Sequence, residues 1–259
     1  MPKSSIVMRS AEIMDVVCGE GAPLGFSRIV ALTGLPKSSV HRLLSILLEE
    51  RQLAFDSDRQ TYQPGPRLLT WAAGALQRNN LPELCTAAMD DLNAQTGNHV
   101  CLSVLDGGSV LHLRTVDQAE RFRPAPRVGE RSPAHVCALG KVLLAYLRPQ
   151  RREALLGDLV LERYTEHSIT GRDVLEEELA HVRENGFAQC DREEFLAVVG
   201  IAAPIFDQLG DAIAALSLWN VAEDQDLNVL RGFADTLCQT TASLSARLGY
   251  RETVRAEVT

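Results

Sequence analysis

The run FSRIVALTGLPKSSVHRLLS, at residues 26–45, has the pattern of two short helices that meet at Gly34. Apolar residues recur in the second helix at i, i+3, i+4 and i+7, which predicts that one face is buried. These positions are Val40, Leu43, Leu44 and Leu47. Pro36 suits the first turn of this helix, where its missing N–H is not needed. The run therefore predicts a helix-turn-helix with an apolar back.

The front of the second helix carries small polar and basic side chains. At 100° per residue, Ser38, Arg42 and Ser45 lie opposite the apolar stripe, with His41 beside them. A helix that only solubilises a surface would more often carry Glu/Lys pairs there. A short helix with this front fits the major groove of DNA, where side chains reach the base edges.

The segments around this run predict a winged helix-turn-helix. Residues 10–18 read as a first helix, 26–33 as a second and 36–51 as a third. Strand-like residues 53–55 and 61–63 then flank a turn, whose tip can reach a phosphate or the minor groove. The alternative is a small helical bundle used for protein contacts. The candidate DNA-contacting residues are Ser27, Lys37, Ser38, Ser39, His41, Arg42, Ser45 and Arg59.

The charge of the chain divides along its length. The whole chain of 259 residues carries a net charge of −8. Residues 1–80 hold nine Lys/Arg and seven Asp/Glu, a balance of +2, and the rest hold 17 and 27, a balance of −10. Because phosphate contacts supply much of the affinity for DNA, so mildly basic a module would bind weakly as a monomer. Two copies in one oligomer would strengthen the binding.

Composition excludes several other classes of protein. No apolar run is long enough to span a bilayer, and the N-terminus lacks the pattern of a secretion signal, so we expect a cytoplasmic protein with no membrane partner. The six cysteines are then reduced thiols. None forms a CxxC pair, and nothing in the sequence indicates a metal site or a cofactor.

The remainder of the chain predicts a second domain of α+β class. A boundary at 64–66 leads into a linking helix, which gives a DNA-binding domain at 1–66, a linker at 67–80 and a further domain at 81–252. Strands are predicted in pairs around turns, which favours a largely antiparallel sheet. The predicted strands are 100–105, 109–116, 187–190, 198–206 and 212–219. The predicted helices are 82–97, 134–147, one from a capping box at 170–173 to Gly186, and 227–248.

Several motifs in register carry a family resemblance over nearly the full length. They are GLPKSSVHRLLSIL, VGERSPAHVCALGKVLLAYL, YTEHSIT, VRENGFA, DREE and GIAAPIFDQLGDAIAALSL. The chain resembles the IclR family of bacterial transcription regulators. The resemblance implies a winged helix on double-stranded DNA at a roughly palindromic operator, a linker helix and a GAF-like domain that binds a small organic acid. It also implies a homodimer, often paired into a tetramer. Repression is the first expectation, with activation left open.

The resemblance also implies the residues of an effector pocket. Backbone amides around Ala138, Leu139 and Gly140 resemble those that hold the ligand's carboxylate, close to a helix start where an anion is favoured. Asp191 matches a pocket acid, Val198 an apolar wall and Ser217 a hydroxyl.

Two positions of this pocket depart from the family pattern. Gly200 stands where many relatives have Cys or Ser, which removes a polar contact and widens the pocket. Trp219 stands where smaller residues are common, so the ligand can differ from the small acids that some relatives sense. Arg121, Arg123 and Arg127 precede the signature and either supplement anion binding or are simply solvated.

Two other functions compete with a regulator. His135, Cys137 and Asp191 are the residue types of a thiol hydrolase, but a spacing of two residues points His135 and Cys137 to different sides of a helix. No nucleophile elbow, P-loop or metal cluster is present in the sequence, so we expect no enzyme activity. A redox sensor built on Cys101, Cys137 or Cys190 lacks a paired cysteine spacing.

Overall fold

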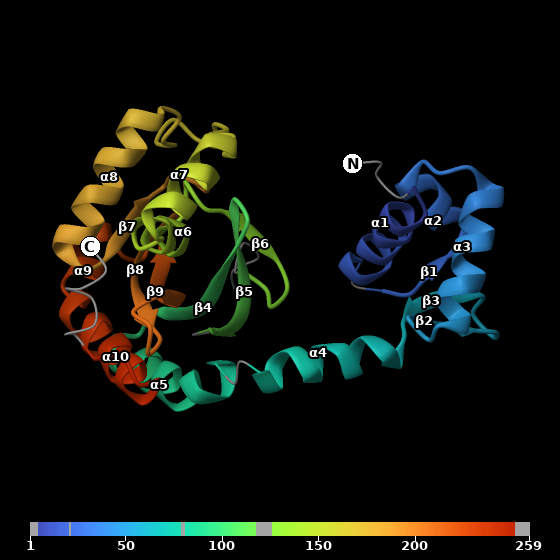
Figure 1. Ribbon diagram of the computed structural model, residues 1–259, viewed down its shortest axis with the longest axis horizontal. Helices are drawn as coiled ribbons and strands as arrows, with labels where there is room; N and C mark the ends of the chain where they lie inside the picture. Colours follow the sequence, from blue (N-terminus) through green and yellow to red (C-terminus); the bar gives the residue numbers. More distant parts are fainter. Residues whose placement is uncertain (1–4, 21, 79–80, 118–125, 252–259) are drawn as a thin grey trace. The chain divides into compact units, whose positions relative to one another are not determined.

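The computed structural model describes residues 5–20, 22–78, 81–117 and 126–251. Two compact units divide the chain, Met1–Asn80 and Leu81–Thr259 (Figure 1). The described part contains no helix that is both long enough and apolar enough to span a membrane.

The first unit is the predicted winged helix-turn-helix (Figure 1). Its helices are α1 (Ser5–Gly19), α2 (Phe26–Thr33), α3 (Lys37–Glu49) and α4 (Pro66–Arg78). Its strands are β1 (Leu24–Gly25), β2 (Leu53–Asp56) and β3 (Thr61–Pro64), which form an antiparallel sheet in the order β1-β3-β2. The sequence did not predict β1, because two residues are too few to show an alternation of polar and apolar side chains.

The core of this unit explains how α3 is held. The apolar stripe predicted on α3 is buried against Ile13, Ile29 and Leu53, which come from α1, α2 and β2. The turn before α3 uses Gly34 in the left-handed region, at φ +65°, where its N–H closes α2 on the Val30 carbonyl at 3.0 Å. This conformation suits glycine and ends α2, so that the chain can change direction before α3 begins.

The second unit is built around one six-stranded antiparallel sheet in the order β6-β5-β4-β9-β8-β7 (Figure 1). Its strands are β4 (His99–Asp106), β5 (Ser109–Val116), β6 (Arg131–Pro133), β7 (Ala188–Asp191), β8 (Val198–Phe206) and β9 (Ala212–Val221). Its helices are α5 (Leu81–Thr96), α6 (Ala138–Ala145), α7 (Pro149–Asp158), α8 (Arg172–Asn185), α9 (Leu227–Arg231) and α10 (Ala234–Arg247). The α+β class with an antiparallel sheet is therefore confirmed.

Helices cover both faces of the sheet. On one face, α5 and α10 bury alternate residues such as Leu102, Ile201 and Leu216. On the other face, α6 and α8 pack against residues of opposite parity, including Cys101 and Trp219. Because neighbouring strand residues point to opposite faces, this second set also determines which side chains can face a cavity beside α6.

Several predicted helix boundaries differ from the structure, and α1 begins at Ser5 rather than at residue 10. The helix predicted at 134–147 begins at Ala138, because 131–133 pair with β5 as β6 and the Ala134 N–H donates to the Gly108 carbonyl at 3.0 Å. The capping box at 170–173 is wrong: α8 begins after Gly171, which has no side chain to cap it. The helix predicted at 227–248 is divided at Gly232, where i→i−3 bonds tighten the turn.

Candidate nucleic-acid interface and effector cavity

The predicted DNA-contacting face of α3 is exposed to solvent. Lys37, Ser38, His41, Arg42 and Ser45 are exposed, and Ser39 is half-buried. The Ser45 hydroxyl donates to the His41 carbonyl at 3.0 Å, which keeps this side chain close to the helix. The face thus offers a basic, hydrogen-bonding front on a helix whose back is fixed in the core.

Two further predicted contacts lie on neighbouring elements of the same unit. Ser27 is exposed in the first turn of α2, and the ring of Phe26 meets that of His41 edge-on at 6.3 Å. Arg59 lies in the turn between β2 and β3, where its side chain is 78% exposed. The Asp56 carboxylate accepts the N–H groups of Asp58 and Arg59 and so holds the tip of this turn.

The second unit contains a cavity of about 150 Å³ on the α6 face of the sheet. Six of the eight residues that the family resemblance placed in an effector pocket line it: Ala138, Leu139, Val198, Gly200, Ser217 and Trp219. The other lining residues are Cys101, His112, Pro126, Glu130, Arg131, Ser132, Cys137, Cys190, Glu194 and Phe195. Among the described residues the walls are mainly apolar, with a polar side formed by β5, β6 and the segment after β7.

The start of α6 forms one end of this cavity. Cys137 is the N-cap, and its thiol accepts the Gly140 N–H at 3.3 Å. Ala138 and Leu139 lie in the first turn, where N–H groups have no acceptor within the helix and where an anion is favoured. Gly140 does not line the cavity, and its N–H is already taken, so the geometry does not support its predicted contact with the ligand.

Gly200 and Trp219 form a directly opposed pair on β8 and β9. A Cβ atom at Gly200 would lie 3.2 Å from both the Leu218 carbonyl oxygen and the Trp219 Cβ. The glycine therefore allows the close approach of the Leu218–Trp219 backbone and the Trp219 Cβ, and it adds no side chain to the cavity wall. The indole also stacks on the His99 ring, at 4.2 Å between centroids.

We expect Gly200→Val to destabilise the protein by about 1–3 kcal/mol, because the added side chain overpacks the Trp219 contact. The measurement is urea denaturation followed by circular dichroism. Gly200→Ala adds only the Cβ atom and should therefore cost less stability than Gly200→Val. Equal stability of Gly200→Val and the parent protein would contradict the tight packing of this pair.

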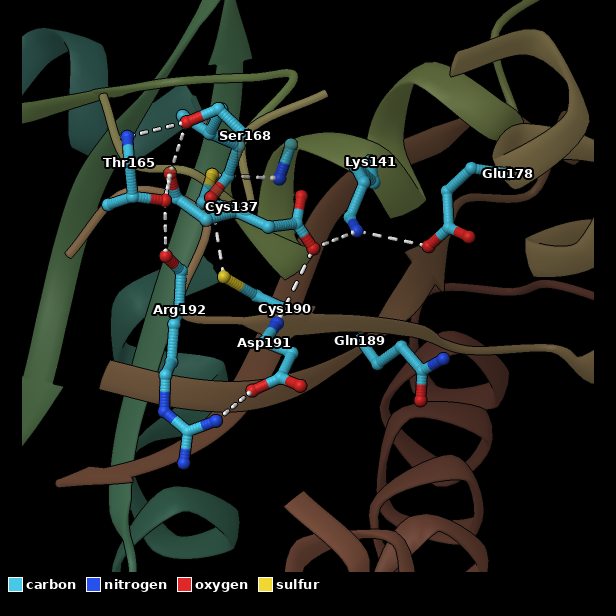
Figure 2. Close-up of polar contacts among 12 residues, drawn as sticks. Cys137, Lys141, Thr165, Ser168, Glu178, Gln189, Cys190, Asp191 and Arg192 are labelled. Carbon is cyan, nitrogen blue, oxygen red and sulfur yellow. Dashed lines mark hydrogen bonds and ion pairs between the residues drawn. The ribbon is translucent and has the colours of Figure 1, made fainter. Parts of the chain in front are cut away.

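Asp191 lies on the other side of β7 from the cavity. Its neighbour Cys190 lines the cavity and donates to the Val136 carbonyl, whereas the Asp191 carboxylate turns toward the Arg192 guanidinium at 3.3 Å (Figure 2). Because adjacent strand residues point to opposite faces, a side chain at 191 cannot share the direction of Cys190. The structure does not bring Asp191 into the cavity.

A buried ion cluster holds the segment after β7 against α6. The Lys141 ammonium, 1% exposed, donates to Glu178 at 3.0 Å and to Glu193 at 2.7 Å (Figure 2). Burial disfavours the Lys141 cation, but the two carboxylates outweigh it and raise the pKa of Lys141, so it stays charged. The hydroxyls of Thr165 and Ser168 donate to the Glu193 carbonyl, at 3.1 and 2.7 Å. These bonds fix the backbone next to Glu194.

Sequence reasoning did not find the polar side of the cavity. His112, Ser132 and Glu194 line it, and Ser103 stands behind His112. Burial lowers the pKa of His112, which is neutral near pH 7, and raises the pKa of Glu194 to about 7. The only signal in the sequence was a histidine at an inward position of the strand 109–116.

The geometry does not support the competing functions. His135 Nε2 bonds the Glu162 carbonyl at 2.9 Å, whereas the Cys137 thiol accepts from Gly140, so these two side chains form no nucleophile–base pair. Burial raises the pKa of the Cys137 thiol well above its usual value, and those of Cys101 and Cys190 to about 12. Thiols of this kind are rarely ionised and react slowly with oxidants.

The three arginines before the signature contribute little to the described site. Arg127 is exposed and does not line the cavity, and Arg121 and Arg123 lie outside the described residues. The cavity residue Arg131 is exposed and pairs with the Asp106 carboxylate.

A winged helix-turn-helix unit and a second unit with a ligand-sized cavity define a DNA-binding transcription regulator with an effector domain. Residues 6–57 match the IclR helix-turn-helix domain, and residues 73–246 match the family described as bacterial transcriptional regulator IclR C-terminal. The chain belongs to the IclR family of bacterial transcriptional regulators. Its relatives are named as regulators rather than enzymes.

Individual relatives agree with this assignment. The chain is 28% identical over 250 residues to the HTH-type transcriptional regulator XynR of Escherichia coli. The match covers 96% of this chain and 99% of XynR. A solved regulator from Rhodococcus sp. RHA1 is similar at a TM-score of 0.78 and 25% identity, over 94% and 97% of the two chains. An IclR homolog from Microbacterium hydrocarbonoxydans, solved with 4-hydroxybenzoate, has a TM-score of 0.76 at 24% identity, over 92% and 100%.

Proposed function

We propose that this regulator binds a roughly palindromic operator through two copies of α3 and acts as a repressor that a small organic acid controls. The observation that carries the proposal is the exposed basic front of α3 on a helix whose back is buried. Arg42 and His41 would reach base edges, and Lys37, Ser38 and Arg59 would bind phosphates. Ser27, Ser39 and Ser45 complete the proposed interface.

A second copy of the chain supports both affinity and control. Residues 1–80 carry a charge of only +2 and the rest of the chain −10, so a single DNA-binding unit should bind DNA weakly. A dimer would double the number of phosphate contacts. Leu69 and Trp71 of α4 are exposed, at 74% and 50%, and offer apolar surface for another subunit. We therefore propose a homodimer or a pair of dimers.

The cavity supports an effector about the size of a single ring. A cavity of about 150 Å³ is similar in size to an engineered protein cavity that admits benzene. The acid's carboxylate would lie at the N–H groups of Ala138 and Leu139, beside the Trp219 and Val198 walls. The 4-hydroxybenzoate bound by the Microbacterium relative is an acid of this size. The effector of this protein would control DNA binding by binding more tightly to one of two arrangements of the regulator.

The proposal predicts that Arg42→Ala weakens operator binding. Loss of one base-reading side chain from each of two subunits should lower affinity about thirtyfold or more, since each good base contact is worth ~1–3 kcal/mol and two are lost. The measurement is a gel-shift titration with the DNA upstream of the protein's own gene. Arg151→Ala, an exposed arginine of α7, is the matched control and should bind like the parent. No specific complex with the parent protein at low salt would overturn the proposed function.

A further inference from the structure

Four polar side chains beside the effector cavity lie end to end. The Ser103 hydroxyl lies 2.8 Å from His112 Nδ1, and His112 Nε2 lies 3.2 Å from the Ser132 hydroxyl. Ser132 is also close enough to the Glu194 carboxyl group to favour its ionised form. The first three are at most 8% exposed, and three of the four line the cavity. These residues come from β4, β5, β6 and the segment after β7, so the row crosses one side of the site.

The protonation states of His112 and Glu194 determine which group donates in each hydrogen bond of the row. Because His112 is neutral, one ring nitrogen donates and the other accepts. Ser132 favours the ionised form of Glu194, as a hydroxyl that donates to the carboxylate does. The Ser132 oxygen can then accept from His112 Nε2–H, and His112 Nδ1 can accept from Ser103. In this arrangement every hydrogen bond points toward Glu194.

Glu194 is the end of the row that can meet a ligand. Ser132 supplies one hydrogen bond, whereas a carboxylate can accept about four. The neighbouring Glu193 is held by Lys141 and Ser168, which keeps the backbone that carries Glu194 beside the cavity. An effector that fills the cavity without offering a donor would leave this carboxylate shielded from water and short of hydrogen bonds, which is costly.

We propose that Glu194, held by the Ser103–His112–Ser132 row, is the specificity-determining residue of the effector site and binds a hydroxyl group of the effector. The effector class is then a hydroxylated acid, in preference to the unsubstituted acid or a dicarboxylic acid. This inference rests on the proposed effector function of the cavity. A hydroxyl group both donates and accepts, so it satisfies Glu194 whether the carboxyl is ionised or neutral, and both forms are present near pH 7. A second carboxylate would repel the ionised form.

The test uses the fluorescence of Trp219, which lines the cavity, in the full-length Trp71→Phe protein, where it is the remaining tryptophan. The probes are benzoate, meta-hydroxybenzoate, para-hydroxybenzoate and terephthalate. We expect at least one hydroxybenzoate to bind about tenfold to a hundredfold more tightly than benzoate, as a hydrogen bond to a charged group allows. Terephthalate should bind more weakly than both benzoate and that hydroxybenzoate.

Three variants connect the preference with the row. Glu194→Leu should bring the ratio of hydroxybenzoate to benzoate affinity close to one, whereas Glu194→Gln keeps an acceptor oxygen without the charge and should retain only part of the ratio. Ser132→Ala should reduce the ratio in part, and Glu184→Gln, an exposed carboxylate of α8, should leave it unchanged.

The outcomes separate this inference from the proposed function. Equal binding of benzoate and both hydroxybenzoates, or an unchanged ratio in Glu194→Leu, would overturn the hydroxyl preference while leaving an acid-binding regulator intact. Binding of none of the hydroxylated probes would also overturn it. A failure of the regulator itself would instead show as a lack of specific DNA binding in the gel shift.

Discussion

Replacing Lys141 with methionine is expected to lower the free energy of unfolding by about 3–5 kcal/mol, the usual cost of removing one partner from a buried ion cluster. Methionine keeps the apolar stem of the side chain, so the loss comes from the charge. Glu193, 9% exposed at its side chain, would be left without its cation. The measurement is urea denaturation at pH 8, followed by circular dichroism.

The same substitution should show a defined dependence on pH. Without Lys141, the pKa of Glu193, which burial already raises, would rise further in the folded state. The unfolded chain would then bind fewer protons than the folded one above the ordinary glutamate pKa of about 4.5, so the variant loses stability as pH increases. The deficit of Lys141→Met should therefore be smaller at pH 5 than at pH 8.

Two controls test whether burial is the cause. Lys141→Met/Glu193→Leu removes both charges of the shorter ion pair, and we expect it to recover much of the loss. Arg148→Ala breaks an exposed bidentate pair with Asp211, which is 2.7 Å away, and exposed pairs contribute at most about 1 kcal/mol. If Lys141→Met cost no more than Arg148→Ala at pH 8, the cluster would not be a structural anchor of the cavity wall.

The parts of the fold that follow from the sequence are those with strong local periodicity. The apolar stripe of α3 predicted its buried back and, by exclusion, its exposed front. The hairpin between β4 and β5 followed from the Gly107 turn, where φ is +60°. The start of α6 did not follow, because Ala134 continues an apolar pattern that also suits a helix. Only the pairing of β6 with β5, which is a long-range contact, moves the start to Ala138.

The effector cavity was predictable in outline and not in its polar chemistry. Residues carried over by family resemblance placed Val198, Ser217 and Trp219 on the cavity, because alternate positions of β8 and β9 share one face. Asp191 fell outside it because the strand parity at β7 directs Cys190 inward. The row that ends at Glu194 could not be found, because its members lie up to 91 positions apart in the sequence, from Ser103 to Glu194, and meet only in the folded sheet.

Gly140→Ala is expected to destabilise the second unit by about 3 kcal/mol or more, the upper range for overpacking a well-filled core. A Cβ at this position would lie 2.3 Å from both the Cα and the carbonyl oxygen of Ala134. These are backbone atoms, so a side-chain rotation cannot relieve the contact, and α6 would have to move away from the segment that carries Ser132. We therefore expect weaker probe binding in the Trp219 fluorescence titration as well as a lower urea midpoint.

Gly157→Ala provides the matched control, because this glycine also lies in a helix, α7, and an added Cβ would meet nothing within 4 Å. There the substitution should stabilise the protein by about 0.5–1 kcal/mol through helix propensity alone. Stability changes of opposite sign at the two glycines would show that Gly140 is needed for the close packing of α6. That packing places the N–H groups of Ala138 and Leu139 at the cavity, while Gly140 itself does not contact the ligand. If the Gly140→Ala protein had normal stability but failed to bind acids, the result would instead support a direct contact between Gly140 and the ligand.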